Sequence, residues 1–278
     1  MKVTFLGVTT LLIDDGETAV MTDGFFSRPG FFHTVRSKIE PDVGRISASL
    51  ARAGVTKLAA VIPVHSHYDH ALDAPIVAQR TGALLVGSPS TANIGRGYGL
   101  AEDRIKVVVA PHTMSFGRIG VWFVHAVHSP HALYPGSILA PLTPPARVSE
   151  YLEGECFSLF FECAGRTVLV HASAGFIPGA LAGRHADVVY LGVATLGNLG
   201  GSYRDEYWHE VVEATGARRV YPVHWDDFWR PLDQPLQPEP RFIDDFDAAM
   251  RFLTERGHGS GVEVRMPQAW VATDPFDE

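Results

Sequence analysis

A histidine-rich run, His65-Ser66-His67-Tyr68-Asp69-His70, places three imidazoles and one carboxylate within six residues. It directly follows the apolar stretch 58–64, whose composition is typical of a buried strand. Side chains that follow such a strand leave the sheet at its carboxyl end, where α/β folds place ligand sites. Neutral nitrogen donors combined with a carboxylate suit zinc, iron or manganese better than calcium or magnesium. The run therefore predicts a metal centre rather than a solvated turn.

The segment that leads into this run has a counterpart later in the sequence. Residues 54–65 and 216–224 each begin with a glycine, continue as an apolar segment with Pro-Val, and end in a histidine, His65 or His224. Each follows a predicted helix, 46–53 or about 203–215, that the glycine would end. This similarity predicts two like halves that face each other.

The rest of the chain alternates between strand and helix patterns. Strands are predicted over 83–87, 104–109 and 120–127, and the opening segments 2–13 and 19–21 are predicted to form a hairpin. The sequence thus indicates an α/β fold in which sheets carry helices on their outer faces. No polar linker divides the chain, so we expect a single domain over residues 1–278.

Composition excludes several classes of protein. The chain has 46% hydrophobic residues, but it contains neither an apolar run of about 20 residues nor a signal sequence at its start. We therefore expect a cytoplasmic protein that does not enter membranes. A net charge of −8 argues against a nucleic-acid partner, because binding to phosphates needs a basic face. Cys156 and Cys163 lie in one strand-like segment and are expected to be buried, reduced thiols.

The run at 65–70 resembles the metal-binding signature of the metallo-β-lactamase fold, and the resemblance covers most of the chain. It implies an αββα sandwich, in which two mixed β-sheets face each other with helices outside. Asp23, after the second opening segment, matches an aspartate that braces the histidine loop without binding metal. His128 matches the third histidine of the family because it ends the strand 120–127, although His131 competes for this role. His125 faces the opposite side and is expected to be structural.

The late motifs of this fold also have counterparts. His224 matches the last histidine, and Ser173 stands where the family usually has an aspartate that bridges two metals. His171 is expected to pack within its strand, although it could supply a further ligand. Asp226 and Asp227 are expected in a turn or helix cap. The resemblance implies two divalent ions, zinc in preference to manganese or iron, with one held weakly because Ser173 lacks a carboxylate. The implied ligands are His65, His67 and His128 for one ion, and Asp69, His70 and His224 for the other.

The resemblance implies a metal-dependent hydrolase that uses a metal-bound hydroxide to cleave an ester, lactone or amide bond. Asp69 is the candidate for orienting the attacking water, and the chain is similar in detail to the ascorbate-6-phosphate lactonase-like branch. The alternatives are a non-catalytic metal-binding sensor or partner protein of this fold and a phosphodiesterase, the latter opposed by the acidic charge. Loops after the strands suggest an apolar pocket and a small-molecule substrate with an apolar portion. The predicted pocket residues are Phe25, Phe26, Tyr134, Trp225 and Phe228, with Phe31, Phe32 and Trp229 as further candidates.

Overall fold

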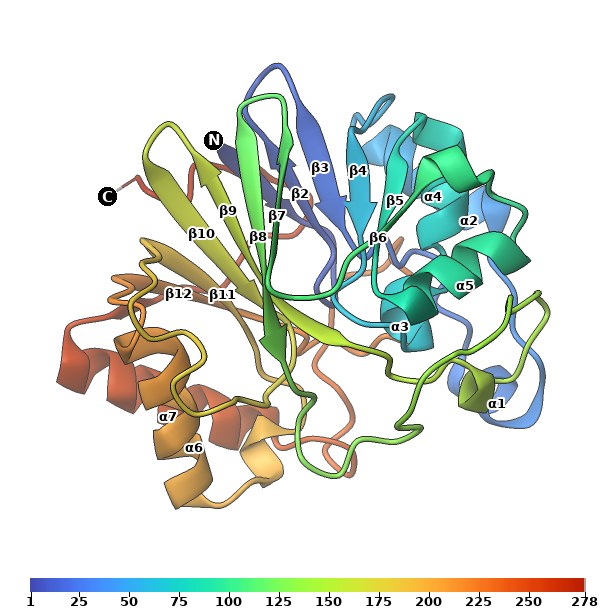
Figure 1. Cartoon of the computed structure of the whole chain (residues 1–278). Helices are drawn as coiled ribbons and strands as arrows, with labels where there is room; N and C mark the ends of the chain where they lie inside the picture. The colour runs from blue at the N-terminus through green and yellow to red at the C-terminus, as the bar shows by residue number, and fades with distance from the viewer. Residues whose placement is uncertain (278) are drawn as a thin grey trace.

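Two seven-stranded sheets face each other in the computed structural model, which describes residues 1–277 (Figure 1). The first sheet has the order β14-β1-β2-β3-β4-β5-β6. Its pairings are antiparallel from β14 to β3 and parallel from β3 to β6. Its strands are β1 (Lys2–Phe5), β2 (Leu11–Asp14), β3 (Ala19–Thr22), β4 (Ala60–Ile62), β5 (Leu84–Gly87), β6 (Ile105–Val107) and β14 (Ala272–Thr273).

The second sheet repeats this mixed pattern with the order β13-β12-β11-β10-β9-β8-β7. Strands β7 to β10 pair antiparallel, and β10 to β13 pair parallel. Each sheet is therefore half antiparallel and half parallel, so the two sheets have the same pattern of strand directions, as expected for two similar halves. The strands are β7 (His112–Phe116), β8 (Ile119–Ala126), β9 (Cys156–Cys163), β10 (Arg166–His171), β11 (Val188–Gly192), β12 (Arg219–Val223) and β13 (Glu263–Val264).

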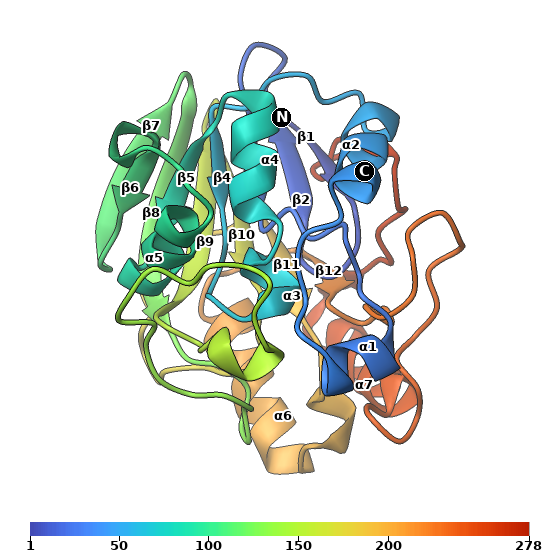
Figure 2. The same cartoon turned by 90° about the vertical axis from the view of Figure 1, so that its right-hand side faces the viewer.

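Helices cover the outer face of each sheet (Figures 1 and 2). Over the first sheet lie α2 (Val43–Arg52), α4 (Ala74–Thr81) and α5 (Pro89–Gly97). Over the second lie α6 (Gly201–Trp208), its π-helical continuation His209–Glu213, and α7 (Phe246–Ser260). The predicted αββα sandwich is confirmed. Short helices make up the rest: α1 (Phe31–Arg36), α3 (Tyr68–Ala71), and the 3-10 turns Glu102–Arg104, Val148–Glu150 and Leu196–Asn198.

Alternation along the strands builds three apolar layers. In β11, Val188 and Tyr190 pack into the core between the sheets, while Val189 and Leu191 pack under the helices of the second sheet. All five residues of this strand are buried, because a strand that is covered on both faces exposes neither face to solvent. The helix predicted over 46–53 begins earlier, at Val43, because the Asp42 side chain accepts the Arg45 amide and caps the helix.

The strands that precede the predicted ligands end at one edge of the sandwich (Figure 1). Strands β3 and β4 run parallel in the first sheet, and β8, β10 and β12 share one direction in the second. The segments that follow them therefore meet at this edge, where α3 also lies (Figure 2). No helix within residues 1–277 is long and apolar enough to cross a membrane.

Candidate metal centre

Three imidazoles form a first cluster at this edge. His65 and His67 lie in the loop after β4, and His128 lies two residues beyond β8. The Nε2 atom of His65 is 3.1 Å from Nδ1 of His67, and the rings of both lie about 5 Å from the His128 ring between centroids. One nitrogen from each residue lies within 4.8 Å of the others. This spacing lets all three nitrogens reach one cation.

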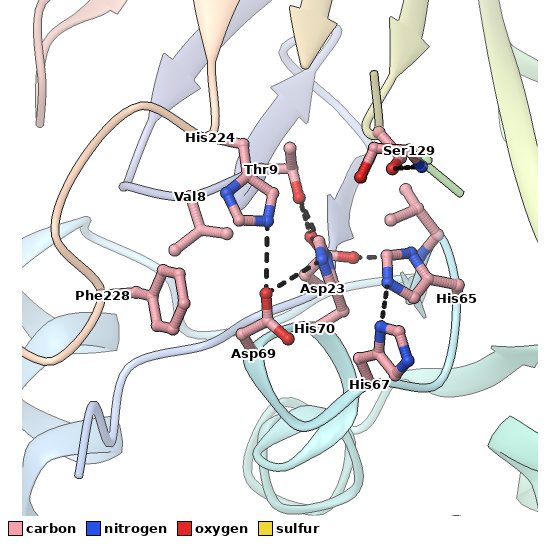
Figure 3. A network of polar contacts seen from close by, with 12 residues as sticks. Val8, Thr9, Asp23, His65, His67, Asp69, His70, Ser129, His224 and Phe228 are labelled. Carbon is pink, nitrogen blue, oxygen red and sulfur yellow. Dashed lines mark hydrogen bonds and ion pairs between the residues drawn. The ribbon is translucent and has the colours of Figure 1, made fainter. Parts of the chain in front are cut away.

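A second cluster combines one carboxylate with two imidazoles (Figure 3). Asp69 and His70 lie on α3, and His224 directly follows β12. The Oδ2 atom of Asp69 is 3.3 Å from Nε2 of His70 and 3.2 Å from Nε2 of His224. The rings of His65 and His70 are 4.0 Å apart between centroids, so the two clusters are direct neighbours. The structure thus brings together all six predicted ligands.

Asp23 braces the second cluster without facing it as a ligand. It is fully buried after β3, with a positive φ of 53°. Its Oδ2 lies 2.8 Å from Nδ1 of His70 and also accepts the Thr9 hydroxyl, while its Oδ1 accepts the Val64 amide at 2.9 Å. This contact leaves Nε2 of His70 free for a ligand role, since a partner at one ring nitrogen fixes the use of the other.

The two clusters differ in charge. Burial lowers the pKa of His65 and of His67, and it lowers that of His128 to about 4, so the first cluster offers neutral nitrogens. Burial opposes charge on Asp69 as well, but His70 and His224 hold the pKa of its carboxyl well below the usual range. Burial also opposes charge on His70, yet the carboxylates of Asp69 and Asp23 raise its pKa to about 10. A cation at the second cluster would therefore replace a proton on His70.

The donor set fits metal binding. Nε2 of His70 is buried and makes no hydrogen bond within residues 1–277, although it faces the Asp69 carboxylate. An unbonded buried nitrogen is costly unless something else satisfies it, and a cation between His70, Asp69 and His224 would do so. Imidazole nitrogens with one carboxylate oxygen are ligands that suit zinc, iron or manganese.

The other candidate residues near the centre take structural positions. The Ser173 hydroxyl accepts the Ser129 amide at 2.8 Å and thereby holds the loop that carries His128. His171 is buried with both ring nitrogens occupied, Nδ1 by Ser158 at 2.8 Å and Nε2 by the Gly175 carbonyl at 2.7 Å. It therefore packs in its strand, as expected. His131 and His125 are exposed, and neither is among the residues that converge on the centre.

The predicted pocket is only partly where the sequence placed it. Phe25 and Phe26 do not line it, because both are fully buried in the core. The Asp73 carboxylate accepts the Phe26 amide and draws this segment inward. Trp225 packs against other aromatic rings instead, those of Phe5 and Phe246. The Phe228 ring does lie beside His224, with centroids 5.9 Å apart, and Tyr134 is 36% exposed with its carbonyl 3.4 Å from Nε2 of His67.

Sequence reasoning missed a buried ion pair next to the second cluster. Asp226 is not in the turn or helix cap that was expected: it forms an isolated bridge with Pro238, is fully buried, and lies 2.6 Å from the Arg28 guanidinium. Its other oxygen accepts the Val8 amide at 2.8 Å. No local pattern marks this pair, because its members are 198 residues apart and each lies in an irregular loop.

Comparisons with known proteins find similar chains among proteins named as metal-dependent hydrolases. No protein-family model matches the chain. It is 29% identical over 129 residues to a UPF0173 metal-dependent hydrolase from Christiangramia forsetii, a match that covers 42% of this chain and half of that relative's length. A UPF0173 metal-dependent hydrolase from Staphylococcus aureus is 22% identical over 232 residues, covering 82% of this chain and 87% of the relative.

Solved structures share the fold at low sequence identity. The metallo-beta-lactamase fold protein YhfI from Bacillus subtilis has a TM-score of 0.57 at 14% identity, with 98% of each chain covered. CmlA, a diiron beta-hydroxylase from Streptomyces venezuelae, has a TM-score of 0.60 at 14% identity, covering 98% of this chain and 53% of its own. Because CmlA is a hydroxylase while the sequence relatives are named as hydrolases, the fold alone does not define the reaction. This chain has the metallo-β-lactamase fold and is related to proteins named as metal-dependent hydrolases.

Proposed function

We propose that this protein is a metal-dependent hydrolase that acts at the two neighbouring clusters. The observation that carries the proposal is the convergence of six donors as two adjacent groups of three. His65, His67 and His128 would hold one divalent ion, and Asp69, His70 and His224 would hold the other. Zinc is the first candidate for both, with manganese and iron as alternatives, because the set combines five imidazoles with a single carboxylate.

When bound, a pair of divalent ions would lower the pKa of a shared water far below its value in bulk solvent, toward about 7, and polarise the bond to be cleaved. The chain's own contribution centres on Asp69. Both of its close contacts, to His70 and to His224, use Oδ2. The carboxylate is thus fixed in orientation. Its Oδ1 can accept a hydrogen bond from the attacking water and orient that water toward the bond to be cleaved. Asp69 is therefore the proposed catalytic residue.

The surroundings favour a small substrate with an apolar portion, joined by an ester, lactone or amide bond. A row of aromatic rings leads away from His224: Phe228 contacts Trp229 at 4.5 Å between centroids, and Trp229 contacts Phe31 at 4.9 Å. Phe31 is 39% exposed and Phe32 is 67% exposed at the outer end. A hydrophobic substituent lying along this row would be removed from water while the scissile bond sits at the metals.

A non-catalytic metal sensor of the same fold is the second candidate. Ser173 favours it, because its hydroxyl binds the Ser129 amide and supplies no bridging carboxylate. A phosphodiesterase is less favoured because the chain carries a net charge of −8.

The test combines metal analysis with a hydrolysis screen. Protein loaded with zinc or manganese is offered lactones, esters, amides and phosphodiesters, beside the variant Asp69→Asn. Hydrolysis by wild type, with loss of activity in the variant, supports the proposal. Wild-type protein that holds two ions yet turns over none of these classes would favour the sensor instead.

A further inference from the structure

His224 is the one imidazole of the second cluster whose second nitrogen lacks a brace. In His70, Nδ1 is held by Asp23, whereas Nδ1 of His224 is buried and has no hydrogen-bond partner within residues 1–277. Ligand histidines usually bond through the nitrogen that does not face the metal, which fixes the plane of the ring. The direction of the His224 ring must therefore be set by its backbone.

Val8, in the loop between β1 and β2, lies beside His224 (Figure 3). The His224 amide donates to the Val8 carbonyl at 2.7 Å. Both residues have positive φ, 58° for His224 and 51° for Val8, a conformation that is strained for any residue with a side chain and most so for a β-branched one. Such a pair of strained residues persists only where neighbouring contacts hold it.

The buried pair Arg28–Asp226 supplies those contacts. Asp226 lies two residues after His224, and its Oδ1 accepts the Val8 amide at 2.8 Å. Its Oδ2 receives the Arg28 guanidinium at 2.6 Å, and Arg28 also donates to the Asp227 carbonyl at 3.2 Å. Val8 is thus hydrogen-bonded through its carbonyl to His224 and through its amide to Asp226. These contacts form a closed ring that includes His224.

The Arg28 guanidinium packs directly against the backbone of Gly7, which precedes Val8. A Cβ atom built on Gly7 would lie 2.1 Å from Nη2 of Arg28, so the guanidinium occupies the space that any other residue would fill. The next residue but one, Thr9, places its hydroxyl 3.1 Å from Nδ1 of His70. The same short loop therefore contacts both histidines of the second cluster.

We propose that Arg28 and Asp226 are positioning residues for His224, and that they set how tightly the second cluster holds a metal ion. The effect on metal affinity rests on the proposed function, because it requires a metal at the second cluster. The positioning of His224 does not, because it can be measured in the metal-free protein. With Ser173 in place of a bridging carboxylate, this cluster depends on Asp69, His70 and His224, so misplacing one of the three has a large effect.

The test uses Asp226→Asn and the milder Arg28→Lys. Asparagine keeps an oxygen for the Val8 amide but turns an NH₂ group toward Arg28, and lysine keeps the charge but cannot reach both Asp226 and Asp227 as the forked guanidinium does. The control is Asp187→Asn. Asp187 is buried, accepts the Thr167 amide at 2.9 Å and lies near arginines, but it precedes β11 at the opposite edge of the sheet.

Competition titration with zinc is expected to show the second equivalent bound about 10- to 100-fold more weakly in both variants, with the first equivalent unchanged. Asp187→Asn should bind both as wild type does. Wild-type affinity for both ions in both variants would overturn the proposal, as would an equal loss in the control.

A metal-free readout separates this proposal from the function. Hydrogen exchange of the His224 amide should accelerate in Arg28→Lys while amides in β10 keep their protection. If His224 exchanges at the wild-type rate, the positioning role is refuted whatever the protein binds. If exchange accelerates but wild type takes up only one zinc ion, the positioning role stands and the two-ion function fails.

Discussion

Replacing Asp23 by asparagine tests the brace of the second cluster at nearly constant volume. Asp23 accepts the Val64 amide through Oδ1, and through Oδ2 it pairs with His70 and accepts the Thr9 hydroxyl. When His70 uses Nε2 as a ligand, its Nδ1 carries the proton and must donate. Asparagine offers only one oxygen, so in either orientation its NH₂ group meets a donor, from Val64 or from His70 and Thr9.

The magnitude follows from this mismatch. A buried donor left without an acceptor costs about 1–3 kcal/mol, and Asp23 is fully buried. For a chain of this size each kcal/mol lowers Tm by about 2–4 °C, so the expected fall is roughly 2–12 °C. Zinc affinity at the second cluster should fall by about 10- to 100-fold, because a partner that orients a ligand histidine is disturbed. The first cluster should be unaffected.

Calorimetry of metal-free protein measures the first effect, and zinc competition titration measures the second. Asp187→Asn again serves as the control, since it makes the same carboxylate-to-amide change in a buried acceptor of a backbone amide far from the centre. The reasoning fails if Asp23→Asn lowers Tm as expected but binds both zinc equivalents with wild-type affinity. Asp23 would then stabilise the fold without acting on His70.

Three further predictions concern single positions. Asp69→Asn should reduce turnover by orders of magnitude while thermal unfolding stays cooperative, because the amide matches the carboxylate in volume but loses the anionic ligand; wild-type turnover in this variant would place the activity elsewhere. Mild chelation should remove one metal equivalent before the other, because the Ser173 hydroxyl contributes no charge to the centre; metal analysis showing both equivalents retained would mean that other groups compensate. Burial lowers the pKa of His171 to about 4, below the value of about 6.5 expected in the unfolded chain. The folded state then binds fewer protons, so its stability is present above pH 6.5 and falls toward pH 4 by on the order of 3 kcal/mol. Denaturant unfolding of metal-free wild type and His171→Gln at pH 7 and pH 4 checks this, and equal pH dependence in both would contradict it.

The α/β alternation and the strand ends that carry the ligands could be predicted because their signals are local, whereas the αββα sandwich was implied by the resemblance to the metallo-β-lactamase fold. The apolar stretch 58–64 followed directly by ligands requires a strand that ends at the centre, and residues 216–224 repeat the pattern. Period-two alternation separated His128, which lies at the first cluster, from the exposed His125. In each case a few consecutive residues carry the information, so no tertiary contact had to be known. Placement in a lactonase-like branch remains a prediction.

The predictions that failed depend on distant contacts. Phe25 and Phe26 follow a strand and read equally as pocket wall or core, and the Asp73 carboxylate, 47 residues after Phe26, draws them inward. The brace formed by Arg28 and Asp226 spans 198 residues of sequence. A charge is stable inside a protein only beside its partner, so the burial of Arg28 follows only once the fold has brought Asp226 to it.

Ser173 explains why the contacts of Asp23, Arg28 and Asp226 matter for the second cluster. At the position where the resemblance to the metallo-β-lactamase fold implies a bridging aspartate, this chain has a hydroxyl that accepts the Ser129 amide and so supports the His128 loop. The second cluster must then rely on the placement of its own three ligands. Among the non-glycine residues with positive φ, Val8, Asp23 and His224 lie beside that cluster. Each such conformation costs on the order of 1–3 kcal/mol and persists only where its surroundings hold it. The buried contacts of Asp23, Arg28 and Asp226 hold the strained backbone at these three positions, and through it the placement of His70 and His224.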